Sequence, residues 1–478
     1  MTPSPETDFG ALFAPRAVAV VGASSGTGGI ANTFLRNLRP GGYDGRIYPV
    51  HPSAPTIEGF PAVRSLADLP EQVDYAYVAV SAAQTPSLFQ GAAGKVRFVQ
   101  VISSGFAESG EQALQDRLVA AVHEAGARLI GPNCLGLHAP RARLSFVDGV
   151  AFASEGVGVL SQSGGLGVDI LRRGQTRGVR FTGLVTLGNC ADLATSDLLA
   201  WYLADPATRV IGLYLEDAWD ARRLFDMLRA AKGSKPVVLL KGGRTADGQR
   251  ASASHTAALA QDDRLWLAFA RQTGTVLVET LDAFLDALLL FQCAAPRATP
   301  TRRVVLFGNG GGTSVLAADA FSRAGFTVPR FAAATLARLE ALALPPGSSV
   351  QNPVDTPAGT LRQEDGRIAR RIFDAFALEP EIGAVVMHLN MTVILSYANP
   401  RILPNLFEAA MAARGDGADA SHFVLVLRSD GEAAIEAQKQ RYREQAVAAS
   451  IPVYNELVEA AQALRGLATY EAYVRRRR

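Results

Sequence analysis

One pattern occurs three times along this chain of 478 residues: an apolar run, a turn rich in Gly and Ser, and a helix-forming stretch. The apolar runs occupy 17–21, 156–160 and 303–307, and the turns after them occupy 22–29, 161–165 and 308–314. Continuous apolar runs of this length are typical of strands that are buried on both faces of a parallel sheet. The repeat therefore predicts three parallel-sheet units, each opened by a strand, a turn and a helix.

Further apolar runs follow each opening at the spacing of βα units. They lie at 45–50, 75–80, 98–102 and 127–130, then at 183–187, 210–215, 236–240 and 274–278, and finally at 382–387, 423–427 and 451–454. The length also suits about three domains of roughly 100–200 residues each. We expect an α/β protein with three doubly wound parallel-sheet domains in tandem, Rossmann-like and flavodoxin-like, at 1–148, 149–297 and 298–478.

Charge and cysteine content exclude several classes of protein. Lys and Arg number 47 against 45 Asp and Glu, a net charge of +2, which gives no attraction towards nucleic acid or an anionic membrane. The 3 Cys residues are too few for a disulfide framework or a Cys-based zinc site, and no metal is expected. The N-terminus lacks the pattern of a signal peptide, and the most apolar stretch, 275–295, contains three acidic residues. A cytoplasmic protein outside the membrane is expected.

The first Gly-rich turn, which contains Gly22, Ala23 and Ser24, would present backbone N–H groups at the positive end of a helix. Such a turn suits a phosphate or pyrophosphate group. It does not spell G-x-G-x-x-G, and the strand at 45–50 is followed by His51 and Pro52 where a site for NAD usually has Asp or Glu. NAD is therefore disfavoured, and a tight turn that binds no ligand stays open as an alternative.

The second and third turns contain hydroxyl groups and glycines but no Lys, so neither is a Walker A loop. Each offers backbone donors at a helix N-terminus, where an anion is stabilised. Both turns are expected to face one phosphate that arrives and leaves. The predicted phosphate-binding residues are Ser161, Gln162, Ser163, Gly164, Gly165, Gly310, Gly311, Gly312 and Thr313.

His255 stands apart from the other histidines because it lies in a segment of small residues after the strand that ends at Leu240. We expect this segment to be a movable loop, and the basic Lys241, Arg244 and Arg250 to make it favourable for anions. The remaining histidines are interpreted as surface or hydrogen-bonded residues without a functional role; they are His51, His123, His138, His388 and His422.

Eight short motifs, in order and spacing, resemble the NDP-forming acyl-CoA synthetases, relatives of succinyl-CoA synthetase. The chain is most similar to the α subunit of the ADP-forming acetyl-CoA synthetase type, from about residue 10 to 465. The motifs are Gly22-Ala23-Ser24, Tyr48-Pro49-Val50, Gly131-Pro132-Asn133-Cys134-Leu135-Gly136, Ser161-Gln162-Ser163-Gly164, Gly188-Asn189, Tyr214-Leu215-Glu216, Ser254-His255-Thr256 and Asn352-Pro353-Val354-Asp355.

The resemblance implies a role for each domain and for particular residues. The first domain would bind coenzyme A, and the second would carry His255, which is phosphorylated during turnover. Glu216 would be the second catalytic residue and would orient the imidazole of His255, which suits a nucleophilic histidine. The residues implied at the CoA site are Gly22, Ala23, Ser24, Val50, Ser81 and Ser103, and those implied to line the acyl site are Pro132, Asn133 and Asn189.

The implied reaction is acyl-CoA + ADP + phosphate ⇌ carboxylic acid + CoA + ATP, through an acyl phosphate and phosphorylated His255. Because three α/β domains use up the chain, ADP or ATP with Mg²⁺ would bind a separate ATP-grasp β subunit, in an αβ or α₂β₂ assembly. The other substrate would be a small carboxylic acid that the sequence does not name. Family members usually continue Ser-His-Thr with Gly-Ser, whereas this chain has Ala257 and Ala258.

Two other classes of function stay open. The chain could be a non-catalytic protein that binds CoA or acyl-CoA, in which Ala257 and Ala258 mark a lost activity, or a subunit of a related acyl or carbamoyl phosphotransferase. Formation of phosphohistidine at His255 separates the first of these from the synthetase. An NAD-dependent oxidoreductase is the least favoured alternative.

Overall fold

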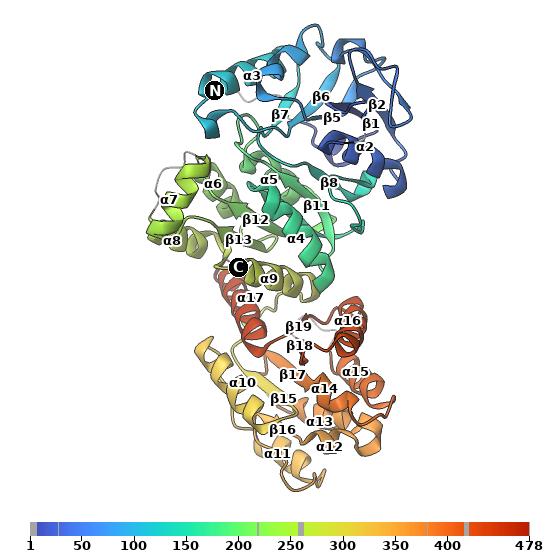
Figure 1. The fold of residues 1–478 in the computed structure, drawn as a ribbon. Coiled ribbons are helices and arrows are strands. Elements are labelled where there is room, and N and C mark those ends of the chain that lie inside the picture. The colour runs from blue at the N-terminus through green and yellow to red at the C-terminus, as the bar shows by residue number, and fades with distance from the viewer. Residues whose placement is uncertain are drawn as a thin grey trace. The chain divides into compact units, whose positions relative to one another are not determined.

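The computed structural model describes residues 7–26, 28–217, 219–256, 262–379, 381–414 and 420–477, apart from the side chains of 253–256 and 358. The chain forms two compact units, Met1–Glu279 and Thr280–Arg478, and each is described by itself. The first unit contains two large sheets and the second contains one (Figure 1).

The first sheet of unit 1 is entirely parallel, in the order β2-β1-β5-β6-β7. All residues of β1, which lies between β2 and β5, are buried, as the continuous apolar run predicts. Its strands are β1 (Ala17–Val21), β2 (Arg46–Val50), β5 (Val73–Val78), β6 (Val96–Val101) and β7 (Arg128–Ile130), with a hairpin of β3 (Thr56–Ile57) and β4 (Phe60–Pro61). Its helices are α1 (Gly10–Phe13), α2 (Ile30–Gly41) and α3 (Gln112–Glu124), with 3-10 turns η1 (Leu66–Asp68), η2 (Ala82–Gln84), η3 (Pro86–Phe89) and η4 (Ala107–Ser109).

The second sheet follows the order β14-β13-β12-β10-β11-β8-β9, with the first five strands parallel. Its strands are β8 (Leu137–Ala139), β9 (Leu144–Ser145), β10 (Gly156–Ser161), β11 (Phe181–Thr186), β12 (Thr208–Leu215), β13 (Val237–Lys241) and β14 (Val276–Val278), with the 3-10 turn η5 (Pro140–Ala142). Its helices are α4 (Gly164–Arg177), α5 (Thr195–Ala204), α6 (Ala221–Ala231), α7 (Ala246–Thr256) and α8 (Asp263–Thr273). The hydroxyl of Ser163 caps α4 at its start, and Gly178 in a left-handed conformation ends it.

The structure differs from the expected first boundary at 148 in one respect. The short strands β8 and β9 precede 148 but extend the second sheet, because β8 pairs with β11 in antiparallel orientation through Leu184 and His138. Strands of two and three residues leave too short an apolar pattern to be recognised in the sequence. The proposed boundary therefore cuts through the edge of a sheet.

Unit 2 contains one parallel sheet in the order β16-β15-β17-β18-β19. Its strands are β15 (Val304–Gly308), β16 (Val354–Asp355), β17 (Ala384–Asn390), β18 (His422–Arg428) and β19 (Val453–Tyr454). Its helices are α9 (Leu281–Cys293), α10 (Gly311–Arg323), α11 (Ala333–Glu340), α12 (Ala358–Leu361), α13 (Ile368–Phe376), α14 (Met391–Leu395), α15 (Ile402–Ala413), α16 (Ala433–Ala448) and α17 (Leu457–Arg477), with the 3-10 turn η6 (Gln363–Gly366). Helix α9 lies before the expected boundary at 297, yet it packs against α17 within this unit.

A buried amide joins the two sheets of unit 1. Gln100 of β6 is fully buried, accepts a hydrogen bond from the hydroxyl of Tyr75 at 2.5 Å and donates one to the carbonyl of Thr186 in β11 at 3.0 Å. A buried amide that lost these partners would cost free energy, so the pairing fixes one sheet against the other.

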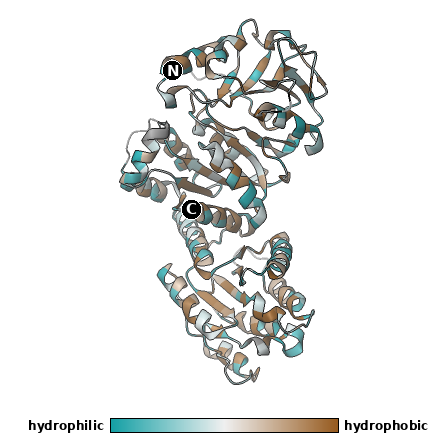
Figure 2. Cartoon of the chain, viewed as in Figure 1, coloured by the Kyte–Doolittle hydropathy of each residue, from teal (hydrophilic) through white to brown (hydrophobic). Residues whose placement is uncertain are grey.

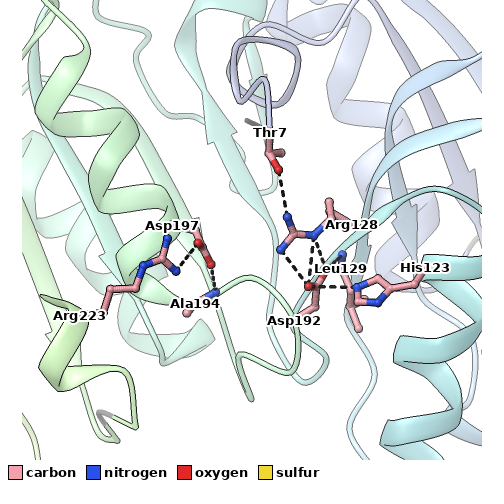
Figure 3. A network of polar contacts seen from close by, with 8 residues as sticks. All are labelled: Thr7, His123, Arg128, Leu129, Asp192, Ala194, Asp197 and Arg223. Atoms are coloured by element: carbon pink, nitrogen blue, oxygen red, sulfur yellow. Dashed lines mark hydrogen bonds and ion pairs between the residues drawn. The ribbon is translucent and has the colours of Figure 1, made fainter. Parts of the chain in front are cut away.

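A second polar contact between the sheets surrounds Asp192, in the segment after β11 (Figure 3). Its carboxylate accepts hydrogen bonds from the guanidinium of Arg128 at 2.9 and 3.0 Å, from the backbone N–H of Leu129 at 2.8 Å, and a contact from His123 at 3.1 Å. Arg128 also donates to the hydroxyl of Thr7. Burial opposes ionisation of Asp192, but these donors outweigh it and lower its pKa.

The strands are mostly hydrophobic and the helices carry the polar residues (Figure 2). The predicted α/β class, with parallel sheets in tandem, is confirmed. Within the part of the chain that the structure describes, no helix is both long enough and apolar enough to cross a membrane.

Candidate functional site

The first Gly-rich turn joins β1 to α2 and needs glycine at its first position. Gly22 has a φ of +99°, and a Cβ atom there would lie 2.4 Å from the carbonyl oxygen of Ala79. A side chain at this position would therefore push the turn away from the neighbouring strand. Ala23 is buried, whereas Ser24 is exposed.

A residue that the sequence analysis did not identify, Asn32 of α2, holds this turn in place. Its carboxamide oxygen accepts from the N–H of Ser24 at 3.0 Å, and its nitrogen lies 2.9 Å from the carbonyl of Ser24 and 3.2 Å from that of Gly26. The same nitrogen lies 2.7 Å from a carboxylate oxygen of Glu58. Asn32 is 1% exposed, so the turn rests on a buried, fully hydrogen-bonded amide.

The other predicted CoA residues lie at the carboxyl ends of neighbouring strands of the same sheet, where ligands enter open α/β sheets. Val50 ends β2 and is buried. Ser81, after β5, is exposed and donates to Gln84 at 2.9 Å. The hydroxyl of Ser103, after β6, is buried and has no hydrogen-bond partner among the described residues. An unpaired buried hydroxyl at this edge fits a polar ligand.

In the second turn, after β10, some polar groups are bonded within the turn and others are available to a ligand. The hydroxyl of Ser161 donates to the carbonyl of Ser163 at 2.7 Å, and the hydroxyl of Ser163 accepts from the N–H of Leu166 at 3.3 Å. Gly164 packs against Leu135, whereas a Cβ atom at Gly165 would meet open space. The first-turn N–H groups of α4 have no partner inside the helix, so this end can receive an anion.

Gln162 connects this turn to the end of β12. Its carboxamide oxygen accepts from the backbone N–H of Glu216 at 2.6 Å and of Asp217 at 2.8 Å. The sequence predicted Gln162 as a phosphate ligand, but its side chain oxygen is bound to the backbone that carries Glu216. The structure thus brings the Ser161–Gly165 turn and Glu216 together at one edge of the sheet.

The carboxylate of Glu216 accepts a hydrogen bond from the hydroxyl of Tyr214 at 2.9 Å. The ammonium group of Lys241 donates to the carbonyl oxygen of Glu216 at 3.0 Å and also bonds the carbonyl of Gly242. A Cβ atom at Gly242 would lie 3.0 Å from the hydroxyl of Tyr214, so the chain leaves β13 close against this pair.

His255 lies in α7, so the expected movable loop is wrong for residues 246–256. Alanine is the strongest helix former, and Ala246, Ala251 and Ala253 explain why this segment of small residues becomes a helix. The side chain of His255 and residues 257–261, which include Ala257 and Ala258, lie outside the described residues. Helix α7 lies against η4 of the first sheet.

The expected positive charge beside His255 is largely compensated by other groups. Arg244 pairs with Asp263, and Arg250 pairs with Asp247. Lys241 is buried, bonded to backbone carbonyls, and its pKa is lowered by burial. These contacts offset part of the positive charge of the three residues, and their role in attracting an anion stays a prediction.

The predicted acyl-site residues form a network with two residues that were not predicted, Glu108 and Gln115. The amide nitrogen of Asn189 donates to Glu108 at 2.5 Å and to Gln115 at 2.9 Å, and Asn133 donates to the amide oxygen of Asn189 at 3.3 Å. The carbonyl of Pro132 accepts from the N–H of Asn189 at 3.0 Å. Pro132, Asn133 and Asn189 therefore lie together.

Glu108 also accepts from the backbone N–H groups of Gly105 and Phe106, at 2.6 and 3.2 Å. Burial opposes its ionisation, but the hydrogen bonds from Asn189 and these N–H groups prevail and lower its pKa. Glu108 belongs to η4, the element that lies against α7, so the Asn189 network is bonded to the element next to the helix that carries His255.

The third turn, in unit 2, differs from the second. The carboxylate of Asp355 in β16 accepts from the N–H of Gly310 at 2.9 Å and from the hydroxyl of Ser314 at 3.3 Å. The hydroxyl of Thr313 accepts from Arg428 at 2.5 Å. Gly310, Gly311, Gly312 and Thr313 do begin α10 as predicted, but a resident carboxylate already occupies part of its N-terminus. The nearby His388 is buried, which, together with Arg428, lowers its pKa to about 4.

Two protein-family models match this chain. A CoA binding domain matches residues 16–140, and a succinyl-CoA ligase like flavodoxin domain matches residues 154–291. The first match covers the Gly22 turn and the second covers the Ser161 turn, Glu216 and His255.

Relatives of known name are similar over most of the chain. The chain is 33% identical over 408 residues to subunit alpha of acetate–CoA ligase (ADP-forming) I from Pyrococcus furiosus, covering 83% of this chain and 85% of that one. It is 34% identical over 348 residues to acetate–CoA ligase (ADP-forming) I from Archaeoglobus fulgidus, covering 72% of this chain but 50% of that one.

A solved structure is also similar. It is dinucleotide forming acetyl-coenzyme A synthetase 1 from Ca. Korarchaeum cryptofilum in complex with phosphate and ADP, with a TM-score of 0.84 and 27% sequence identity, covering 98% of each chain.

Proposed function

Because the chain belongs to the family of ADP-forming acetate–CoA ligases, we propose that it is the subunit that binds coenzyme A and carries the phosphoryl group in an ADP-forming acyl-CoA synthetase. The reaction is acyl-CoA + ADP + phosphate ⇌ carboxylic acid + CoA + ATP. The chain would act in the cytoplasm, on a small carboxylic acid.

One observation carries this proposal: Gln162 holds Glu216 beside the turn that begins α4. A phosphorylated histidine needs two groups beside it: a helix N-terminus that binds the phosphoryl group and a carboxylate that orients the imidazole. The N-terminus of α4 and Glu216, at the end of the adjacent strand, are groups of these two kinds. The helix N-terminus stabilises the phosphoryl group, and the carboxylate fixes the tautomer of the imidazole so that its other nitrogen attacks phosphorus. His255 lies in the helix that follows Gly242, which packs against Glu216.

The residues present suit the two proposed ligands, CoA and phosphate. Gly22 and the orphaned hydroxyl of Ser103 suit a polar cofactor at the first sheet, and CoA would supply the thiol that accepts the acyl group. The open position at Gly165 suits phosphate at α4. Asn133 and Asn189 would orient the acyl group through amide hydrogen bonds.

A separate β subunit would bind ADP or ATP with Mg²⁺. The relative from Pyrococcus furiosus is named a subunit, and the chain spans about half of the relative from Archaeoglobus fulgidus, which supports a further component. An ATP-grasp chain, in an αβ or α₂β₂ assembly, is the partner proposed.

The test is phosphorylation of His255. The chain is incubated with acetyl-CoA and radioactive phosphate, or with ATP, Mg²⁺ and its β subunit, and acid-labile, base-stable label on protein is measured. Label is expected on the wild-type chain and at background in His255→Ala, because no other group supplies the nucleophile. His123→Gln, on the surface of α3, is the matched control and should label like the wild type. Absence of label on the wild-type chain, or equal label on His255→Ala, would reject the proposed enzyme and favour a non-catalytic CoA-binding protein.

A further inference from the structure

The carboxylate of Glu216 has one side-chain partner that the sequence analysis did not identify. The hydroxyl of Tyr214 lies 2.9 Å from its Oε1. Tyr214 lies in β12 and Glu216 directly follows the last residue of that strand, and the hydrogen bond shows that their side chains lie on the same side of the chain. Among the described residues, no hydrogen bond is recorded to the other oxygen, Oε2, which leaves it available to an imidazole N–H.

Tyr214 remains a hydrogen-bond donor over the whole range of pH in which an enzyme works. Burial, followed by the charge of Glu216, raises the pKa of its hydroxyl. A protonated phenol that donates to a carboxylate stabilises the ionised form of that carboxylate and fixes the orientation of its plane.

The backbone of Glu216 is fixed independently of this contact. Gln162 accepts from its N–H at 2.6 Å, and Lys241 donates to its carbonyl at 3.0 Å. Gln162 directly follows β10 and Lys241 ends β13, and these are the strands on either side of β12. With the main chain held from both sides, the remaining freedom is the rotation of the side chain, and the hydroxyl of Tyr214 is the group that limits it.

Resting on the proposed function, we propose that Tyr214 is a positioning residue for the phosphoryl-transfer step. It orients the carboxylate of Glu216 so that Oε2 accepts the N–H of the imidazole of His255. The opposite ring nitrogen then attacks the phosphorus of the acyl phosphate, and the N–P bond forms as the P–O bond to the acyl group breaks and the carboxylate leaves. Tyr214 itself neither gains nor loses a proton and does not touch the substrate.

The charged and titratable groups near this carboxylate are few. Asp217 follows it on the same turn, and Lys241 of β13 interacts with both acidic residues. Arg244 contributes to the field at Lys241 but is paired with Asp263. None of these groups changes when only the hydroxyl of Tyr214 is removed, so a slower rate reports the lost hydrogen bond.

The test is Tyr214→Phe, which deletes the hydroxyl and keeps the ring. The rate of His255 phosphorylation from acetyl-CoA and radioactive phosphate is measured between pH 5 and 9 in the full chain with its β subunit. We expect the rate at pH 7 to fall roughly tenfold, the size expected for one hydrogen bond to a charged group. The KM for CoA should not change.

Tyr48→Phe is the matched control because Tyr48 donates to Glu71 at 2.7 Å in the first sheet, a pair of the same kind away from His255. Its profile should match that of the wild type. As a second variant, 3-fluorotyrosine at position 214 keeps the shape and the hydroxyl donor to Glu216, so its rate at pH 7 should stay close to that of the wild type.

An unchanged rate in Tyr214→Phe, or a 3-fluorotyrosine variant as slow as Tyr214→Phe, would overturn the positioning role. A rise in the KM for CoA would also overturn it, because it would show a general structural defect. If the wild-type chain takes no label, the proposed function itself fails. If the wild-type chain takes label and Tyr214→Phe takes label at the same rate, only the positioning role of Tyr214 fails.

Discussion

Among single residues, Asn32 illustrates how a side chain on a helix can shape a turn that binds a ligand. Its carboxamide joins both backbone polar groups of Ser24, the carbonyl of Gly26 and the carboxylate of Glu58. The residue is buried, so removing its amide would leave the N–H of Ser24 and these acceptors without their partner. The geometry of the first turn therefore depends on a residue outside it.

Asn32→Ala is expected to raise the KM for CoA about tenfold while kcat stays near the wild-type value, because the variant disturbs cofactor binding and not the phosphoryl site. The free energy of unfolding should fall by about 1–3 kcal/mol. Steady-state kinetics and urea unfolding measure the two effects. Asn37→Ala is the control, since Asn37 lies on the same helix and makes no recorded hydrogen bond to a described residue. A normal KM for CoA in Asn32→Ala would contradict the role given to Asn32.

At the level of secondary-structure elements, Asp192 ties β7 to the segment after β11 (Figure 3). Its pKa is lower in the folded chain, so the folded state binds its proton less readily than the unfolded state does. The stabilisation is present above the unfolded pKa of about 3.9 and is lost as pH falls through the folded pKa.

Asp192→Asn should reduce the free energy of unfolding of unit 1 at pH 7 by about 2 kcal/mol, the range expected for hydrogen bonds to a charged group. The difference in the free energy of unfolding between wild type and variant should become smaller as pH falls below about 4. Urea unfolding at pH 7 and pH 3.5 measures both. Asp226→Asn breaks the exposed pair with Arg222 and should change stability by less than about 0.5 kcal/mol. If this difference in the free energy of unfolding stayed constant with pH, the charge of Asp192 would not be the source of the stabilisation.

At the scale of the whole molecule, the two sheets of unit 1 share buried polar contacts. Gln100 of the first sheet bonds Thr186 of the second, and β8 completes the second sheet from before residue 148. A fragment of residues 1–279 retains every one of these contacts, whereas a fragment of residues 1–148 loses the bond from Gln100 to Thr186 and the pairing of β8 with β11.

The longer fragment is therefore expected to unfold in one cooperative transition and to resist proteolysis, and the shorter one to aggregate or to unfold without cooperativity. Circular dichroism during urea unfolding, combined with limited proteolysis, distinguishes the two. A stable, monomeric 1–148 fragment would show that the expected boundary at 148 separates independent folding units after all.

The sequence predicted the long buried strands well because apolar runs such as the one in β1 have one structural explanation. It missed β8 and β16, which are too short for a pattern, and it mistook α7 for a loop because small residues suit both. At the site, Gly-rich turns after strands indicated Gly22 and Ser161, and the resemblance to the family indicated Glu216. Contacts such as that between Asn189 and Glu108, which are separated by 81 positions, leave no local pattern.

The carboxylate of Asp355 on the N–H of Gly310 has a consequence for protein engineering. The three Gly-rich turns look alike in the sequence, but one is tied by Asn32, one is linked through Gln162 to Glu216, and one is met by Asp355. A turn that is transplanted alone into another scaffold would keep its sequence but lose the side chain that holds its backbone in place. The transferable unit is the turn together with the residue that anchors it.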